Sequence, residues 1–161
     1  MKHTAYLLLG SNLGDRLKNL SIAVELISRT AGEIKQKSGN YETAPWGKTD
    51  QPVFINQAVA LATDLQPIAL LDRLLAIELQ MGRQRKEKWG ERVIDIDIIF
   101  FDDEVIIHNN RLTLPHPQLQ YRRFVLEPLN EIASDYEHPI LKKNVYSLLC
   151  DVADNLEVKR I

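Results

Sequence analysis

The chain has 161 residues, 45% of them hydrophobic and 26% charged, with a formal net charge of −2 at pH 7. This length and composition are typical of a soluble globular protein, and residues 1–161 are expected to form a single domain. The near-neutral charge argues against a nucleic-acid or membrane partner, so any cationic site must be local.

Cysteine content and the N-terminal region indicate the compartment. Cys150 is the single cysteine, which excludes an intramolecular disulfide and favours a reducing environment. The apolar run in MKHTAYLLLGSN is too short for a signal peptide or a spanning helix, so no targeting segment is expected. We therefore expect a cytoplasmic protein.

Hydrophobic periodicity predicts alternating groups of strands and helices along the chain. The order strand, helix, strand, strand, helix, strand is that of a ferredoxin-like βαββαβ sandwich, an α+β fold whose antiparallel sheet has helices on its faces in three layers (αβα). The expected strands are 4–10, 34–43, 53–63 and 93–101, with a small hairpin at 105–107 and 111–114, and the expected helices are 17–30, 67–81, 117–133 and 142–153.

Known nucleotide-binding motifs are missing from the sequence. Neither G-x-x-x-x-G-K-[ST] nor G-x-G-x-x-G occurs. The segment GSNLGDR after the first strand faintly suggests a phosphate-binding turn, but Ser11, Asn12 and Asp15 are better interpreted as residues that cap the next helix.

Two carboxylates lie inside the apolar strand VIDIDIIFF. Side chains alternate along a strand, so Asp95, Asp97 and Ile99 share one face and the intervening isoleucines face the core. The Cα atoms of the two aspartates are then roughly 7 Å apart. Like charges this close raise each other's pKa unless a cation neutralises them. A metal ion would do so, whereas a solvated sheet face is the simpler alternative.

A basic segment, residues 83–92, precedes this strand. It carries five cations and two anions, for a net charge of +3. Such a run is often only a solvated loop, but arginine binds phosphate oxygens bidentately. Carboxylates without neighbouring His or Cys ligands favour Mg²⁺ or Mn²⁺ over Zn²⁺. Together the two features indicate a site for a metal–nucleotide complex.

Several motifs in the same order resemble one enzyme family. The segment KWGERVIDIDII matches the signature of the 6-hydroxymethyl-7,8-dihydropterin pyrophosphokinases, known as HPPK. Further matches, LLLGSNLGDR, YETAPWG, QPVFINQAV, IELQMGRQR and LPHPQLQYRRFVLEPL, extend the resemblance over essentially the whole chain. The resemblance implies a ferredoxin-like fold and the transfer of pyrophosphate from ATP to the pterin hydroxymethyl group with two Mg²⁺ ions.

The resemblance also implies roles for individual residues. Asp95 and Asp97 would bind the metal ions and, with Arg83 and Arg92, form the catalytic group. The implied ATP-binding residues are Glu78, Arg83, Arg85, Trp89, Arg92, Ile98, Arg111, Thr113, His116 and Arg122. The implied pterin-binding residues are Thr43, Trp46, Phe54, Asn56, Asp95 and Phe124, with Phe54 and Phe124 as the aromatic walls.

Three residues depart from the pattern of the HPPK family, and alternative functions remain. Phe54 stands where many members have tyrosine, Trp46 stands where a smaller apolar residue is frequent, and Leu75 stands where some members have a polar residue. A different metal-dependent nucleotidyl or phosphoryl transferase, a nuclease, or a ferredoxin-like RNA-binding module would use the same carboxylates or basic loop. The expected substrates are ATP and the pterin, and a monomer is expected, with an oligomer left open.

Overall fold

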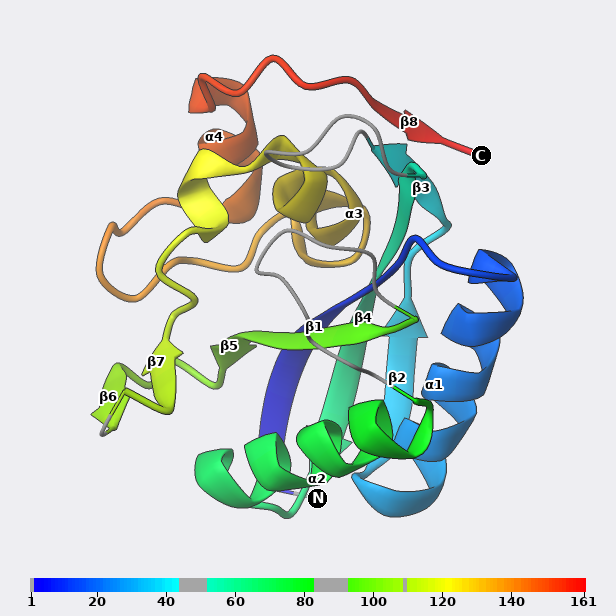
Figure 1. Ribbon diagram of the computed structural model, residues 1–161. Helices are drawn as coiled ribbons and strands as arrows, with labels where there is room; N and C mark the ends of the chain where they lie inside the picture. Colours follow the sequence, from blue (N-terminus) through cyan, green and yellow to red (C-terminus); the bar gives the residue numbers. More distant parts are fainter. Residues whose placement is uncertain (1, 44–51, 83–92, 109) are drawn as a thin grey trace.

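The computed structural model describes residues 2–43, 52–82, 93–108 and 110–161, which contain an antiparallel sheet flanked by helices (Figure 1). The strands of this sheet are β1 (His3–Ser11), β2 (Glu33–Lys37), β3 (Tyr41–Thr43), β4 (Phe54–Thr63), β5 (Asp95–Phe101) and β8 (Val158–Arg160). Their order is β5-β1-β4-β3-β8, and β2 also pairs with β4. A separate hairpin consists of β6 (Ile106–His108) and β7 (Leu112–Leu114).

Helices cover both faces of the sheet, which makes three layers (Figure 1). One face packs against α1 (Arg16–Thr30) and α2 (Pro67–Gln80), and the other against α3 (Arg123–Ala133) and α4 (Val145–Asp151). A short 3₁₀ turn, η1 (Leu119–Tyr121), precedes α3. The mixed architecture with an antiparallel sheet agrees with the α+β prediction.

Sequence periodicity explains the two cores. On β1, Leu7 and Leu9 pack into the core beneath α1 and α2, whereas Leu8 packs into the core beneath α3 and α4. Because both faces of the sheet are covered, the central strands are apolar on both sides. Asp15 caps α1 as predicted, since its Oδ1 accepts a hydrogen bond from Lys18 N at 3.2 Å.

The interpretation of Ser11 and Asn12 as caps was wrong, because the N-cap of α1 is Asp15. Asn12 Nδ2 donates to the carbonyl of Pro52 at 3.1 Å, and Ser11 Oγ accepts from Asn19 Nδ2 at 3.2 Å. Both residues are fully buried. Asn12 links the end of β1 to the segment before β4, Ser11 contacts α1 through the side chain of Asn19, and Asp15 is the N-cap of the helix.

The single strand predicted over 34–43 is two strands, β2 and β3. Ser38 separates them: its N–H donates to Ala58 O and its Oγ accepts from Ala58 N, both at 2.9 Å. The register also shifts between Ile34 and Gln36. A side chain therefore replaces a backbone partner of β4, and the edge bends at this point.

The C-terminal third differs most from the prediction. The helix expected over 117–133 begins only at Arg123, because Arg122 is extended at φ −126° and ψ 111°. The helix expected over 142–153 is limited to α4, and β8 was not predicted. Among the described strands, β5 lies at the edge of the sheet, although an apolar sequence of this kind is typical of an interior strand. No described helix has the length and apolar character needed to cross a membrane.

Candidate active site

The centre of the site is a row of residues across three strands. Gly10 on β1 is the register partner of Asp95 on β5 and of Asn56 on β4. A Cβ atom at Gly10 would lie 2.5 Å from Asn56 Oδ1 and 3.7 Å from Phe54 Cδ1. The missing side chain therefore gives Asn56 and Phe54 room to lean over β1, next to Asp95.

Two buried polar side chains, one in this row and one beside it, have atoms available for a ligand. Thr43 is 2% exposed and Asn56 is 4% exposed. Within the described residues, Thr43 Oγ1 and Asn56 Nδ2 have no hydrogen-bond partner. Thr43 is the register partner of Phe54, so both polar atoms flank the same aromatic ring. Buried polar groups are nearly always hydrogen-bonded, which makes this pair a candidate binding surface for a polar ligand.

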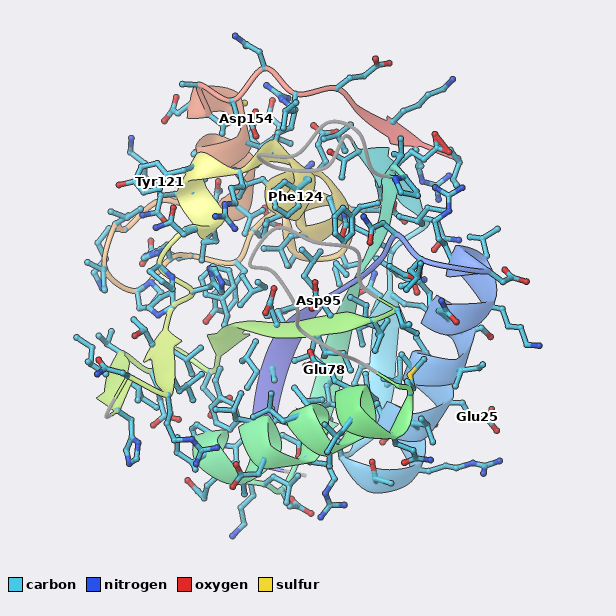
Figure 2. The ribbon with its side chains drawn as sticks, viewed as in Figure 1. Glu25, Glu78, Asp95, Tyr121, Phe124 and Asp154 are labelled. Carbon is cyan, nitrogen blue, oxygen red and sulfur yellow. The ribbon has the colours of Figure 1, made fainter. Side chains whose placement is uncertain are left out.

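The start of α3 provides the opposite side of this group. Figure 2 shows Asp95 on the side of β5 that faces Phe124 and α3. Arg122, which precedes α3, has its Cζ 5.7 Å from the centroid of the Phe124 ring. An aromatic ring and a guanidinium thus lie on the same side of the sheet as Asn56 and Phe54.

Asp95 and Asp97 lie on one face of β5, as the alternation predicted. Ile96 and Ile98 pack into the core on the other face, whereas Ile99 packs beneath α3 and α4. Asp95 is half-buried and Asp97 is exposed. A carboxylate pair with this access to solvent is able to bind a hydrated cation.

Arg122 and His116 bring cationic and hydrogen-bonding groups close to Asp97. Burial lowers the pKa of Arg122 from its ordinary value, while the negative charges of Asp97 and then Asp154 oppose this effect. Burial, assisted by the charge of Arg122, lowers the pKa of His116 to about 4. The imidazole is therefore neutral at pH 7.

The hydrogen bonds of His116 assign its tautomer. Its Nδ1 accepts from Gln118 N at 3.2 Å, and its own backbone N–H donates to Ile99 O at 2.9 Å. Since Nδ1 acts as an acceptor in a neutral ring, the proton lies on Nε2. His116 thus presents an N–H donor beside Arg122.

Glu78 lies on the other side of β5. Figure 2 shows it between β5 and α2, on the side opposite to Asp95. It is 4% exposed, and its Oε2 accepts a hydrogen bond from Ile96 N at 2.7 Å. Glu78 is therefore a buried, hydrogen-bonded carboxylate, although it lies near the end of its helix. Its implied contact with the nucleotide stays a prediction.

Three other implied nucleotide-binding residues lie away from the Gly10 row. Arg111 forms an ion pair with Asp72 on α2. Thr113 is exposed on β7, and the side chain of Ile98 is buried in the core beneath α1 and α2. Their contacts with the nucleotide stay predictions. The implied residues Trp46, Arg83, Arg85, Trp89 and Arg92 lie outside the described residues.

The sequence interpretation missed two contributors to this site. Gly10 was read only as the end of a strand, although its period-two spacing from Leu8 places it on the face that also carries Asn56. Asp154, which influences Arg122, had no signal in the sequence because it lies in a short polar segment after the last predicted helix.

Comparison with known proteins identifies the family. The sequence profile described as 7,8-dihydro-6-hydroxymethylpterin-pyrophosphokinase (HPPK) matches residues 6–134. The chain belongs to the HPPK family. The family relationship was thus correctly predicted from the motifs.

Curated HPPK relatives cover most of the chain. The protein named 2-amino-4-hydroxy-6-hydroxymethyldihydropteridine pyrophosphokinase in Methylorubrum extorquens is 48% identical over 132 residues, which are 81% of this chain and 83% of the relative. Proteins of the same name from Synechocystis sp. and Haemophilus influenzae are 45% and 43% identical, over 91% and 84% of this chain and 75% and 85% of their own.

Solved HPPK-DHPS structures share the fold. A crystal structure of HPPK-DHPS in complex with substrates has a TM-score of 0.77 at 19% identity and covers 93% of this chain. The wild-type Plasmodium falciparum HPPK-DHPS has a TM-score of 0.74 at 20% identity and covers 92% of this chain. This chain spans 43% of each of those two chains.

Proposed function

We propose that this protein transfers a pyrophosphoryl group from ATP to the hydroxymethyl group of 6-hydroxymethyl-7,8-dihydropterin, which yields AMP and the pterin diphosphate for folate biosynthesis. Support comes from its membership of the HPPK family and from relatives 41–48% identical that carry the pyrophosphokinase name. The observation that carries the proposal is a pair of polar atoms, on Thr43 and Asn56, that have no partner among the described residues and lie beside Phe54 and Asp95.

The pterin binds over Gly10 in this proposal. A pterin ring is flat and has donors and acceptors along its edge, which suit the hydroxyl of Thr43 and the amide of Asn56. Phe54 and Phe124 stack on its two faces, and each such aromatic pair contributes about 1 kcal/mol beyond simple burial. Trp46, which lies outside the described residues, is proposed as a further pterin contact.

Asp95 and Asp97 suit Mg²⁺, which keeps several water ligands, better than a metal ion whose ligands all come from the protein. Within the described part of the chain no group of three or more His, Cys, Asp or Glu side chains is placed to hold a metal. Two carboxylates with solvent access suit Mg²⁺, which takes one or two carboxylates and completes its shell with water and substrate phosphates. When bound, two such ions neutralise phosphate charge and lower the pKa of the attacking hydroxyl.

Arg122 and His116 orient the phosphates. Arg122 offers a fixed positive charge, and the Nε2–H of neutral His116 donates a hydrogen bond without adding charge. A well-placed donor that meets charge developing in the transition state contributes about 3 kcal/mol. The expected roles of Arg83 and Arg92 are of the same kind, whereas Glu78, Arg85, Trp89, Ile98, Arg111 and Thr113 are proposed to contact the nucleotide.

The pterin hydroxyl attacks the β-phosphorus in this proposal, so its oxygen forms the new P–O bond and the bond between the α–β bridging oxygen and the β-phosphorus breaks. The hydroxyl proton leaves to solvent, and AMP departs with the bridging oxygen. No side chain acts as a covalent nucleophile. Asp95, which lies next to Asn56 across Gly10, holds the two substrates in register at the point of attack.

A product assay tests this function. Purified protein is incubated with ATP, Mg²⁺ and 6-hydroxymethyl-7,8-dihydropterin, and nucleotides and pterins are separated by chromatography. We expect AMP and a pterin diphosphate in equal amounts. ADP with a pterin monophosphate would refute the pyrophosphoryl transfer, and nucleotide turnover that ignores the pterin would indicate another transferase.

Finer features of the protein are also proposals. Its strand order, with β1 between β5 and β4, supports a ferredoxin-like topology, and the packing of α4 and β8 against the rest supports a single domain over residues 1–161. A single cysteine and bacterial relatives support a cytoplasmic location. We also propose a monomer, which gel filtration at assay concentration tests.

A further inference from the structure

The last residues of the chain lie beyond the part that matches the HPPK family, which ends at residue 134. After α4 the chain crosses the end of α3 and joins the sheet as β8 (Figure 1). We define residues 154–160 as the strap. One end contacts α3, which carries Phe124, and the other pairs with β3, which carries Thr43.

The first end of the strap caps α3. Asp154 Oδ2 accepts a hydrogen bond from Arg123 N at 3.1 Å, and Asp154 O accepts from Arg123 Nε at 3.2 Å. Its Oδ1 accepts from Leu156 N at 2.9 Å, which fixes the carboxylate itself. The residue at the N-cap position, Arg122, supplies no side-chain cap. Asp154 therefore satisfies an orphan N–H and places a negative charge at the helix N-terminus.

This cap lies directly beside the aromatic wall. Phe124 follows Arg123, and Figure 2 shows Asp154 and Phe124 at the same end of α3. The charge of Asp154 also favours the cationic form of Arg122. A change in the cap therefore alters the position of the start of α3, where Phe124 and Arg122 lie.

The second end of the strap pairs with β3. Val158 is the register partner of Thr43, and Arg160 is the register partner of Tyr41. A strand of three residues, such as β3, has few backbone hydrogen bonds of its own. Pairing with β8 therefore gives it a second neighbour besides β4 and restricts the position of Thr43.

A side-chain network joins this end of the strap to α3. Glu131 on α3 accepts hydrogen bonds from Tyr41 Oη at 2.6 Å and from Arg160 Nε at 3.1 Å, both through Oε1. Its Oε2 accepts from Gly39 N at 3.1 Å. A Cβ at Gly39 would lie 2.6 Å from the Arg160 guanidinium, so glycine at this position lets the guanidinium approach the backbone closely. The strap thus fixes β3 and α3 relative to each other.

We propose that the strap sets the spacing between Phe124 on α3 and Thr43 on β3 in the pterin site, and that Asp154 and Arg160 are positioning residues for pterin binding. The inference rests on the proposed function. A flat ring has to contact Phe124 with its face while its edge meets Thr43, so a small shift of α3 from β3 weakens pterin binding. The carboxylates of β5 are positioned by the pairing of β5 with β1 and keep their place.

Steady-state kinetics with full-length variants test the proposal. The KM values for the pterin and for Mg–ATP, and kcat, are measured for Arg160→Ala and Asp154→Asn. The matched controls are Lys159→Ala, an exposed cation on the same strand, and Asp151→Asn, whose exposed ion pair with Lys143 lies outside the strap. Arg160→Lys retains a charge opposite Glu131 and serves as the conservative variant.

We expect both strap variants to raise the pterin KM about fivefold to tenfold, the effect of one lost cap or charge-assisted hydrogen bond. Arg160→Ala leaves the KM for Mg–ATP and kcat within about twofold, Arg160→Lys recovers most of the loss, and the controls match the wild type. Variants that melt at lower temperature with an unchanged pterin KM would overturn the proposal. If the wild type itself does not consume the pterin, that result refutes the proposed function, and it differs from the result that would refute the proposal for the strap.

Discussion

The lowered pKa of His116 gives a test of the phosphate side of the site. In the unfolded chain an imidazole has a pKa of 6.5, and in the folded protein the value for His116 is about 4. Between these pH values the unfolded state binds a proton that the folded state does not. The free energy of unfolding therefore falls as the pH drops from 6.5 towards 4, and the contribution is intact above pH 6.5.

The size of the effect follows from the two pKa values. At about 1.4 kcal/mol per pKa unit, the whole shift corresponds to about 3 kcal/mol, of which about 2 kcal/mol is lost by pH 5. Urea unfolding of the wild type and of His116→Gln at pH 7 and pH 5 measures it. The glutamine variant cannot take up this proton, and the remaining titrating groups cancel in the comparison.

We expect the wild type to lose about 2 kcal/mol more than His116→Gln between these pH values. Equal losses would show that the imidazole is not desolvated in the folded protein and would remove the argument for a neutral donor. Bound Mg–ATP places negative charge beside the ring in our proposal. Titration of the His116 ring by NMR should then show a higher pKa in the complex than in the free protein.

Three further substitutions probe the rest of the site. Gly10→Ala forces Asn56 aside and should raise the pterin KM at least about tenfold, while Mg–ATP binding, measured by calorimetry, is retained. Unchanged pterin kinetics would show that the pterin does not bind over Gly10. Asp97→Asn should lower kcat/KM at least about 100-fold without loss in the free energy of unfolding, because the side chain is exposed and the repulsion from Asp95 is removed. Near-normal turnover would exclude Asp97 as a metal ligand. Glu78→Ala should cost about 1–3 kcal/mol in urea unfolding, since the buried N–H of Ile96 loses its acceptor, and a neutral result would show that water replaces it.

Local patterns predicted the parts of the structure that depend on local physics. Leu20, Ala23 and Ile27 recur at helical spacing and all pack into the core, and Asp15 caps the same helix. Period-two alternation placed Asp95 and Asp97 on one face of β5. In each example the side-chain direction follows from backbone geometry over a few residues, which the sequence alone reveals.

Contacts between distant segments could not be predicted in this way. Ser38 replaces a backbone partner of Ala58, 20 residues away, and this contact divides a strand that is continuous in its periodicity. β8 has the sequence VKR, with two exposed charged residues, and is a strand only because β3 offers it an edge. Asp154 caps a helix that begins 31 residues earlier. Each depends on which surfaces the fold brings together.

The position of β5 at the sheet edge explains why Glu78 is buried. An edge strand exposes one side of its backbone to solvent, and this gives Asp97 the access that a hydrated metal and its phosphates need. The same position leaves the N–H of Ile96, between the two aspartates, available for Glu78 rather than for another strand. A side chain that accepts this hydrogen bond fixes the strand without covering its other face. Glu78 on α2 therefore fixes the strand from the side opposite to Asp95 and Asp97, and the face that carries the two aspartates remains accessible to substrate.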